Sequence, residues 1–172
     1  MWQLFLSLKE WLMAKQLPTI PPIVPKPVNP DEWLDKLIVG LIYAESRGDV
    51  NCVGDKDIPE SKGGKAYGIL QIRSGVRGEV NALWGTRYVG ENLLGEDGAE
   101  LSKMMCQDYM LKVLPQYKSY KSAIKAGIPR DEVCAKSWNG GAGWYLQSKK
   151  EGYGKYARGL EMYWDTVSRH MG

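Results

Sequence analysis

Hydrophobic residues recur at steps of three and four from residue 34 to residue 42, and this spacing predicts a helix. The positions that share one side of it are Leu34, Leu37, Ile38, Leu41 and Ile42. A further step of four from Leu41 reaches Glu45, so the pattern places this carboxyl on the edge of the buried face. Gly48 is placed to end the helix, which puts Glu45 in its last turn.

Two later segments carry the same kind of pattern. Residues 98–114 gather apolar side chains on one broad side, and residues 129–138 begin with a proline and two acids, which suits a first helical turn. The stretch between the first two helices differs. Residues 49–67 are polar and rich in glycine, so they predict a loop or a small irregular hairpin. A short apolar run at residues 66–72 follows it.

The first thirty residues have another character. Residues 1–17 predict a short amphipathic segment, because charged residues interrupt an apolar run that is too short to span a membrane. The segment lacks the basic start and the small-residue cleavage site of a standard secretory signal, so we do not predict one. Docking of this segment on a membrane surface or a protein partner is open. Residues 18–30 hold six prolines and predict a semi-rigid linker that acts as a passive tether. Residues 31–172 then form one globular domain.

The composition narrows the function. A formal net charge of +3 on 172 residues is too small for a nucleic-acid binder, so no nucleic-acid partner is predicted, but it suits a polyanionic wall. Seven Trp and ten Tyr against one Phe favour rings with polar tips, which stack on sugars. The cysteines, Cys52, Cys106 and Cys134, form no ligand pairs and His170 stands alone, so we expect no metal and no cofactor.

The predicted surroundings of Glu45 suit a proton donor. Apolar neighbours and the negative end of the helix dipole both disfavour ionisation, so the pKa of this carboxyl should rise toward neutral pH. A carboxylic acid that donates a proton in catalysis needs that shift. From this helix alone, a glutamate paired with an arginine such as Arg47 at the rim of the core is an equally open interpretation.

Three short segments in this order resemble a known signature. They are Glu45-Ser46 after a helix, the apolar run Gly68-Ile69-Leu70-Gln71-Ile72, and Trp138-Asn139-Gly140-Gly141. Together they are similar to the lytic transglycosylase (SLT) domains and the related goose-type lysozymes, over about residues 33–165. The resemblance implies a mainly helical, α+β lysozyme-like fold. In it, a helical lobe and a small irregular or β lobe at about residues 49–75 flank a substrate groove.

The same resemblance implies roles for single residues. Glu45 would be the catalytic acid, acting on the glycan strands of peptidoglycan. The residues that would bind the substrate are Ser46, Gln71, Trp138, Asn139 and Tyr156. Tyr156 would also hydrogen-bond Glu45, with Tyr153 as the second match, although residues 152–154 depart from the Glu-Thr that usually precedes this tyrosine.

Three functions are open at this point, two catalytic and one non-catalytic. A lytic transglycosylase uses one carboxyl, as acid and then as base, to cut the MurNAc-GlcNAc bond and form 1,6-anhydroMurNAc. A hydrolytic lysozyme needs a second acid, for which Asp55 and Asp57 are candidates, although their sequence is also typical of a solvated turn. A non-catalytic wall-binding or structural module is the third. The enzyme would act in the periplasm or cell wall, and a bacterial and a phage origin are both open.

Overall fold

The computed structural model describes residues 32–59, 62–150 and 152–172, and over these residues the chain is mainly helical, as predicted. The segment 1–17 and the linker 18–30 lie outside the described residues. In chain order the elements are α2 (Glu32–Ser46), β1 (Val53–Gly54), β2 (Ala66–Tyr67), α3 (Ser74–Trp84), the 3-10 turn η2 (Gly90–Leu93), α4 (Gly95–Asp108), the π-turn η3 (Tyr109–Val113), the 3-10 turn η4 (Leu114–Gln116), α5 (Lys118–Lys125), α6 (Arg130–Gly140), α7 (Trp144–Ser148) and α8 (Gly154–Arg169).

Helix α2 confirms the first prediction from the sequence. Its buried apolar residues are Leu34, Leu37, Ile38 and Leu41. The helix ends at Ser46 because Arg47 and Gly48 both adopt positive φ, 54° and 90°. The chain thus leaves the helix one residue before the glycine that was expected to end it, and Glu45 lies in the last turn.

The other predicted helices also form, with different ends. The pattern over residues 98–114 becomes α4 followed by η3 and η4, which bury Met105, Cys106 and Met110 in the core. The third predicted helix, expected over residues 129–138, is α6, and Asn139 lies in its last turn.

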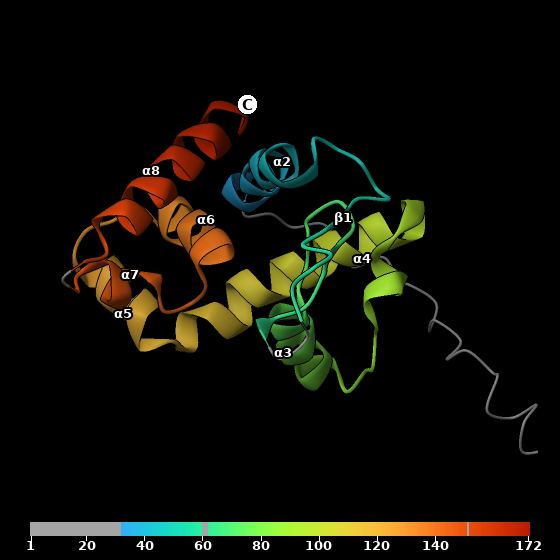
Figure 1. The fold of residues 1–172 in the computed structure, drawn as a ribbon. Helices are drawn as coiled ribbons and strands as arrows, with labels where there is room; N and C mark the ends of the chain where they lie inside the picture. The colour runs from blue at the N-terminus through green and yellow to red at the C-terminus, as the bar shows by residue number, and fades with distance from the viewer. Residues whose placement is uncertain (1–31, 60–61, 151) are drawn as a thin grey trace, which may run out of the picture.

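The elements divide into parts that meet around α2 and α4 (Figure 1). Helices α5 to α8 form what we call the helical lobe, in which α8 packs on α6 and also lies along α2. Residues 49–59 and 62–75 form what we call the small lobe. Its core is an antiparallel hairpin in which Val53 pairs with Tyr67 and Gly54 with Ala66.

The apolar run from Gly68 to Ile72 forms a tight turn directly after β2. Gly68 and Gln71 both have positive φ, 72° and 50°, which reverses the chain so that Ile72 pairs with Tyr67. Side chains of this turn are nevertheless buried, among them Leu70 and Ile72. The run is apolar because it is core, and its backbone is bent because it closes the small lobe.

Two features are absent from the described residues, a membrane-spanning helix and a metal-binding cluster. None of the helices in the described ranges has the length and apolar character needed to cross a membrane. In the same ranges, no three His, Cys, Asp or Glu side chains gather in a way that would hold a metal ion. The three cysteines, Cys52, Cys106 and Cys134, are free thiols.

A substitution at Gly68 tests this turn. A Cβ added to Gly68 would lie 2.1 Å from the carbonyl oxygen of Leu93, in addition to the strain of a φ of +72°. We expect Gly68→Ala to lower the free energy of unfolding by about 2–4 kcal/mol, measured by urea denaturation. Gly48→Ala is the matched control, because φ there is +90° but an added Cβ meets nothing within 4 Å. It should cost only about 1 kcal/mol. Equal losses for both variants would contradict the predicted contact.

Candidate active site

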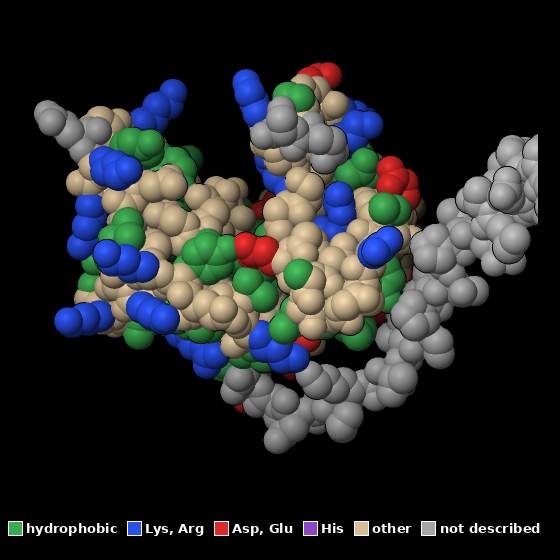
Figure 2. All heavy atoms as spheres, turned by 90° about the horizontal axis from the view of Figure 1, so that it is seen from below, with side chains coloured by type: hydrophobic (Ala, Val, Ile, Leu, Met, Phe, Trp, Pro, Cys, Tyr) green, Lys and Arg blue, Asp and Glu red, His purple; other side chains and the backbone are tan. Residues whose placement is uncertain are grey.

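Glu45 lies where the two lobes meet. Its side chain is half-buried, and the Tyr163 hydroxyl of α8 donates a 2.5 Å hydrogen bond to Glu45 Oε1. From the small lobe, the charges of Arg73 and Asp55 both act on the same carboxyl. Figure 2 shows a notch between the helical lobe and the part that holds the hairpin and α3, with acidic side chains exposed where these parts meet. The carboxyl therefore has one lobe on either side of it.

Burial dominates the ionisation of Glu45. Desolvation raises its pKa from 4.5 to about 7, against the hydrogen bond from Tyr163 and the positive charge of Arg73, which both lower it, while the negative charge of Asp55 raises it. The alternative of a glutamate locked to an arginine is not what the described residues show, since no ion pair of Glu45 occurs among them and Arg47 is exposed. At neutral pH this carboxyl is present in both protonation states.

The tyrosine expected to hold Glu45 was wrongly assigned. Tyr156 donates its hydroxyl hydrogen to the carbonyl oxygen of Gly140 at 2.6 Å, and Tyr163 contacts Glu45 in its place. The two tyrosines are seven residues apart on α8 and so share a helix face, about 10 Å apart along the axis. Burial and the nearby Glu45 raise the pKa of the Tyr163 hydroxyl far above its usual value, so it acts as a neutral hydrogen-bond donor.

Two residues expected to bind substrate use their polar atoms to build the site. Ser46 Oγ donates to the carbonyl oxygen of Ile69 at 2.7 Å, and Trp138 Nε1 donates to that of Leu70 at 3.2 Å. The ring of Trp138 also packs edge-on against Tyr109, with centroids 6.0 Å apart. These contacts attach the end of α2 and the end of α6 to the same turn. They place Ser46 and Trp138 in the framework around Glu45.

Gln71 is committed in a similar way. Its amide nitrogen donates to the carbonyl oxygens of Cys52 and Gly68, at 3.1 and 2.9 Å, which uses both of its hydrogens. Its Oε1 packs against Gly54, where an added Cβ would lie only 2.3 Å away. A ligand can therefore use Gln71 only through its oxygen, as an acceptor.

Asn139 and Tyr156 line a cavity of about 520 Å³ beside the N-terminal half of α8. Its other lining residues are Gly152, Tyr153, Lys155, Gly159 and Leu160. The side chain of Asn139 is exposed at the end of α6, which leaves its amide available to a ligand. Of the residues expected to bind substrate, Asn139 and Tyr156 are the two that make no hydrogen bond with the turn at residues 68–72, and both line this cavity.

The two candidate second acids have different positions. Asp55 forms an ion pair with Arg73, and its charge reaches Glu45. Asp57 is exposed, and it is not among the charges that shift the pKa of Glu45. Of the two, only Asp55 therefore acts on the ionisation of Glu45.

Sequence reasoning missed Arg73 and Tyr163. A signal for Tyr163 was present, because Tyr156, Leu160, Tyr163 and Val167 recur at helical spacing on one face of α8. Arg73 directly follows the apolar run at residues 68–72, but its pairing with Asp55 joins residues 18 positions apart across the hairpin. No local pattern indicates such a contact.

Comparisons of this chain with protein-family models, with curated proteins and with solved structures find no match.

Removing the Tyr163 hydroxyl should raise the pKa of Glu45 above about 7, because its hydrogen bond stabilises the carboxylate. The measurement is a ¹³C NMR titration of the glutamate side-chain carboxyls in Tyr163→Phe. Tyr156→Phe is the control and should leave that pKa unchanged, since the Tyr156 hydroxyl bonds to Gly140. A shift in Tyr156→Phe and none in Tyr163→Phe would restore the assignment made from the sequence.

The raised pKa of Glu45 also predicts how stability depends on pH. The folded protein keeps this proton up to about pH 7, whereas the unfolded chain releases it near 4.5, so its contribution to stability is lost progressively between these values. Glu45→Gln removes the titration and should gain about 2 kcal/mol relative to the parent between pH 5 and pH 8. Urea denaturation of both proteins at each pH measures the difference. A constant difference across this range would mean that Glu45 titrates like a solvated glutamate.

Proposed function

We propose that this chain is a peptidoglycan-cleaving enzyme of lysozyme-like fold, a lytic transglycosylase that cuts the β-1,4 bond between MurNAc and GlcNAc. The observation that carries the proposal is the Glu45 carboxyl, half-buried between the lobes with a pKa of about 7. A carboxyl kept partly dehydrated costs folding free energy, and a proton donor has a use for that state. The order of the three sequence segments supports the same conclusion.

In the first step Glu45 donates its proton to the glycosidic oxygen, and the bond from that oxygen to the muramoyl C1 breaks. Because the Tyr163 hydroxyl hydrogen occupies Oε1, the proton to be donated resides on Oε2. The leaving GlcNAc keeps the proton as a hydroxyl group. Positive charge develops on the muramoyl ring at the same time, and Glu45 is left as a carboxylate.

In the second step the Glu45 carboxylate takes the proton of the muramoyl C6 hydroxyl, and that oxygen bonds to C1. The product is a 1,6-anhydro sugar, Glu45 is again protonated, and no water is consumed. One carboxyl serves both steps, as acid and then as base, which a pKa near the working pH allows. Tyr163 keeps the carboxyl oriented through the cycle, and the cavity at Asn139 and Tyr156 would hold the glycan.

A hydrolytic lysozyme is the second candidate. In that mechanism Asp55 is a better candidate for the second acid than Asp57. The negative charge of Asp55, in the small lobe, acts on Glu45, and a hydrolase needs a second acid near the first to activate water. Its pairing with Arg73 argues the other way, since one of its carboxylate oxygens is already held by the guanidinium group. The two candidates differ in their products, because hydrolysis adds one water molecule to the new reducing end.

Glu45→Gln decides whether this chain is an enzyme. We expect the purified parent to clear a suspension of cell walls and the variant to lose at least about 100-fold in rate, the scale of removing a general acid. Glu79→Gln is a matched control, because Glu79 is also half-buried and bonded by a tyrosine, but it lies on α3 and its partner is Tyr117 instead of Tyr163 of α8. Equal clearance by Glu45→Gln and the parent would end the catalytic assignment, and clearance by neither would favour a binding module.

The mass of the released muropeptides then separates the two enzyme candidates. A transglycosylase yields anhydro products one water lighter than those of a hydrolase. Asp55→Asn should leave the anhydro product and most of the rate intact, with Asp57→Asn as its control. Hydrated products, together with loss of activity in Asp55→Asn alone, would establish the hydrolytic mechanism in place of ours.

A further inference from the structure

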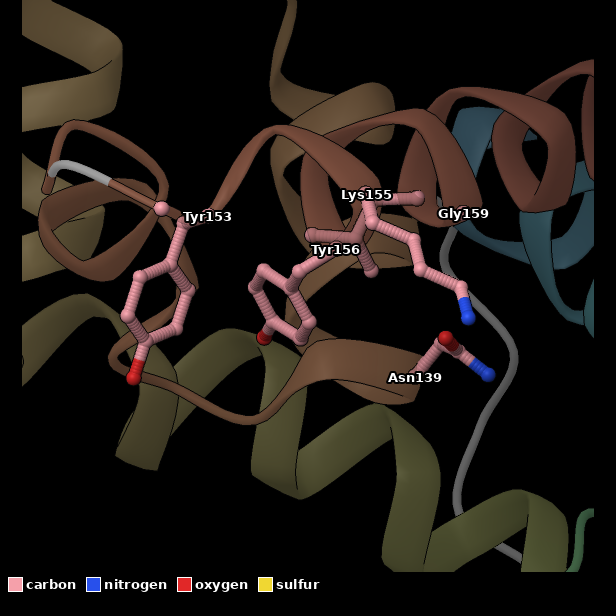
Figure 3. Close-up of a pocket in the computed structure, with 7 residues that line it drawn as sticks. Asn139, Tyr153, Lys155, Tyr156 and Gly159 are labelled. Atoms are coloured by element: carbon pink, nitrogen blue, oxygen red, sulfur yellow. The ribbon is translucent and has the colours of Figure 1, made fainter.

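The cavity beside α8 has an aromatic end and a polar end. Figure 3 shows the rings of Tyr153 and Tyr156 next to each other, and Lys155 and Asn139 extending together on the other side of Tyr156. The two rings meet edge to face, with centroids 5.7 Å apart and an interplanar angle of 88°. Because the Tyr156 hydroxyl is bonded to Gly140, that ring is held in place. A flat ring fixed beside a hollow is a surface on which a sugar can stack.

The polar end of the cavity offers the ammonium group of Lys155. Lys155 is exposed and, within the ranges that the structure describes, has neither an ion pair nor a hydrogen bond. Its nearest basic neighbours in sequence are Lys149, Lys150 and Arg158. Lys and Arg side chains are numerous over the helical lobe in Figure 2. An anionic group on a ligand is therefore favoured at this end of the cavity.

The cavity lies along α8, the helix whose Tyr163 bonds the candidate acid. Tyr156 at the cavity and Tyr163 at Glu45 are seven residues apart on α8, about 10 Å along its axis. Asn139 links the same two places, because the preceding residue, Trp138, is bonded to the turn that also holds Ser46. A glycan strand held at Glu45 can thus continue along α8 into the cavity.

We infer that this cavity is a subsite for the muramoyl units of the glycan, in which Lys155 binds the carboxylate that distinguishes them from GlcNAc. The tyrosine rings would take the sugar, the Asn139 amide its acetamido group, and the Lys155 ammonium group the charge. The location of the strand rests on the proposed function. The carboxylate is either that of the lactyl group or the first one of an attached peptide stem, and both present the same anion to the lysine.

The test measures binding without cleavage, in the full chain carrying Glu45→Gln. Isothermal titration compares three probes: neutral chitotetraose, the alternating GlcNAc-MurNAc tetrasaccharide with free lactyl groups, and the same tetrasaccharide with peptide stems. We expect at least one anionic probe to bind about five- to tenfold more tightly than chitotetraose, since a charge-assisted hydrogen bond has that effect. Adding Lys155→Gln should abolish this preference and leave the affinity for chitotetraose unchanged.

Lys125→Gln is the matched control, because it removes the same charge from an exposed residue on α5 that does not line the cavity. The inference is overturned if Lys155→Gln keeps the preference, if Lys125→Gln removes it equally, or if neutral and anionic probes bind alike. The probe that loses affinity in Lys155→Gln identifies the source of the carboxylate. Because the acid is absent from every protein in this test, a Lys155-dependent preference would stand even if the parent proved unable to cleave walls. If the parent cleaves cell walls but the Glu45→Gln protein shows no such preference, the subsite inference fails and the proposed function stands.

Discussion

The structure depends on keeping one carboxyl, that of Glu45, out of water between two helices that are far apart in sequence. Tyr163 reaches it from 118 residues away, so α8 must pack closely along α2. Gly40 permits this approach, because a Cβ there would lie 2.5 Å from the carbonyl oxygen of Val167. Tyr163 lies one helical turn before Val167 on α8, and Glu45 lies five residues after Gly40 on α2. The close contact of the two backbones thus brings hydroxyl and carboxyl within bonding distance.

A second constraint fixes α8 from the other side. Lys136 of α6 is almost fully buried, at 2% exposure, and pairs with both Glu132 of its own helix and Glu161 of α8. Its ammonium group also lies 5.5 Å from the centre of the Trp144 ring. A buried charge that loses its partners is costly, so this network resists any shift of α8 on α6. Glu161 is two residues from Tyr163, and the network therefore holds the hydroxyl that meets Glu45.

The sequence predicts the local part of this arrangement and misses the part made by distant contacts. Helix α2 and the half-buried position of Glu45 follow from a spacing of three and four, which one stretch of chain contains in full. The assignment of the tyrosine failed because Tyr156 and Tyr163 share a helix face, and only the packing of α8 on α2 decides which one is level with Glu45. The apolar run at residues 68–72 predicts burial but not the turn that the chain makes there, because the positive φ of Gln71 leaves no signal in its residue type.

Polar residues in the three segments that suggested a resemblance to lytic transglycosylases mostly bond to the protein itself, so a residue of such a motif need not contact a ligand. Ser46 and Trp138 each donate a hydrogen bond to a carbonyl oxygen of the turn at residues 68–72, and the Gln71 amide nitrogen donates two hydrogen bonds within the small lobe. These bonds satisfy backbone groups that would otherwise be unpaired around the site, so the three segments build one framework. Within that framework Asp55 is already occupied by Arg73. Glu45 is left as the carboxyl whose pKa burial has moved to about 7, and this asymmetry between the two acids favours chemistry that needs one proton carrier over chemistry that needs two.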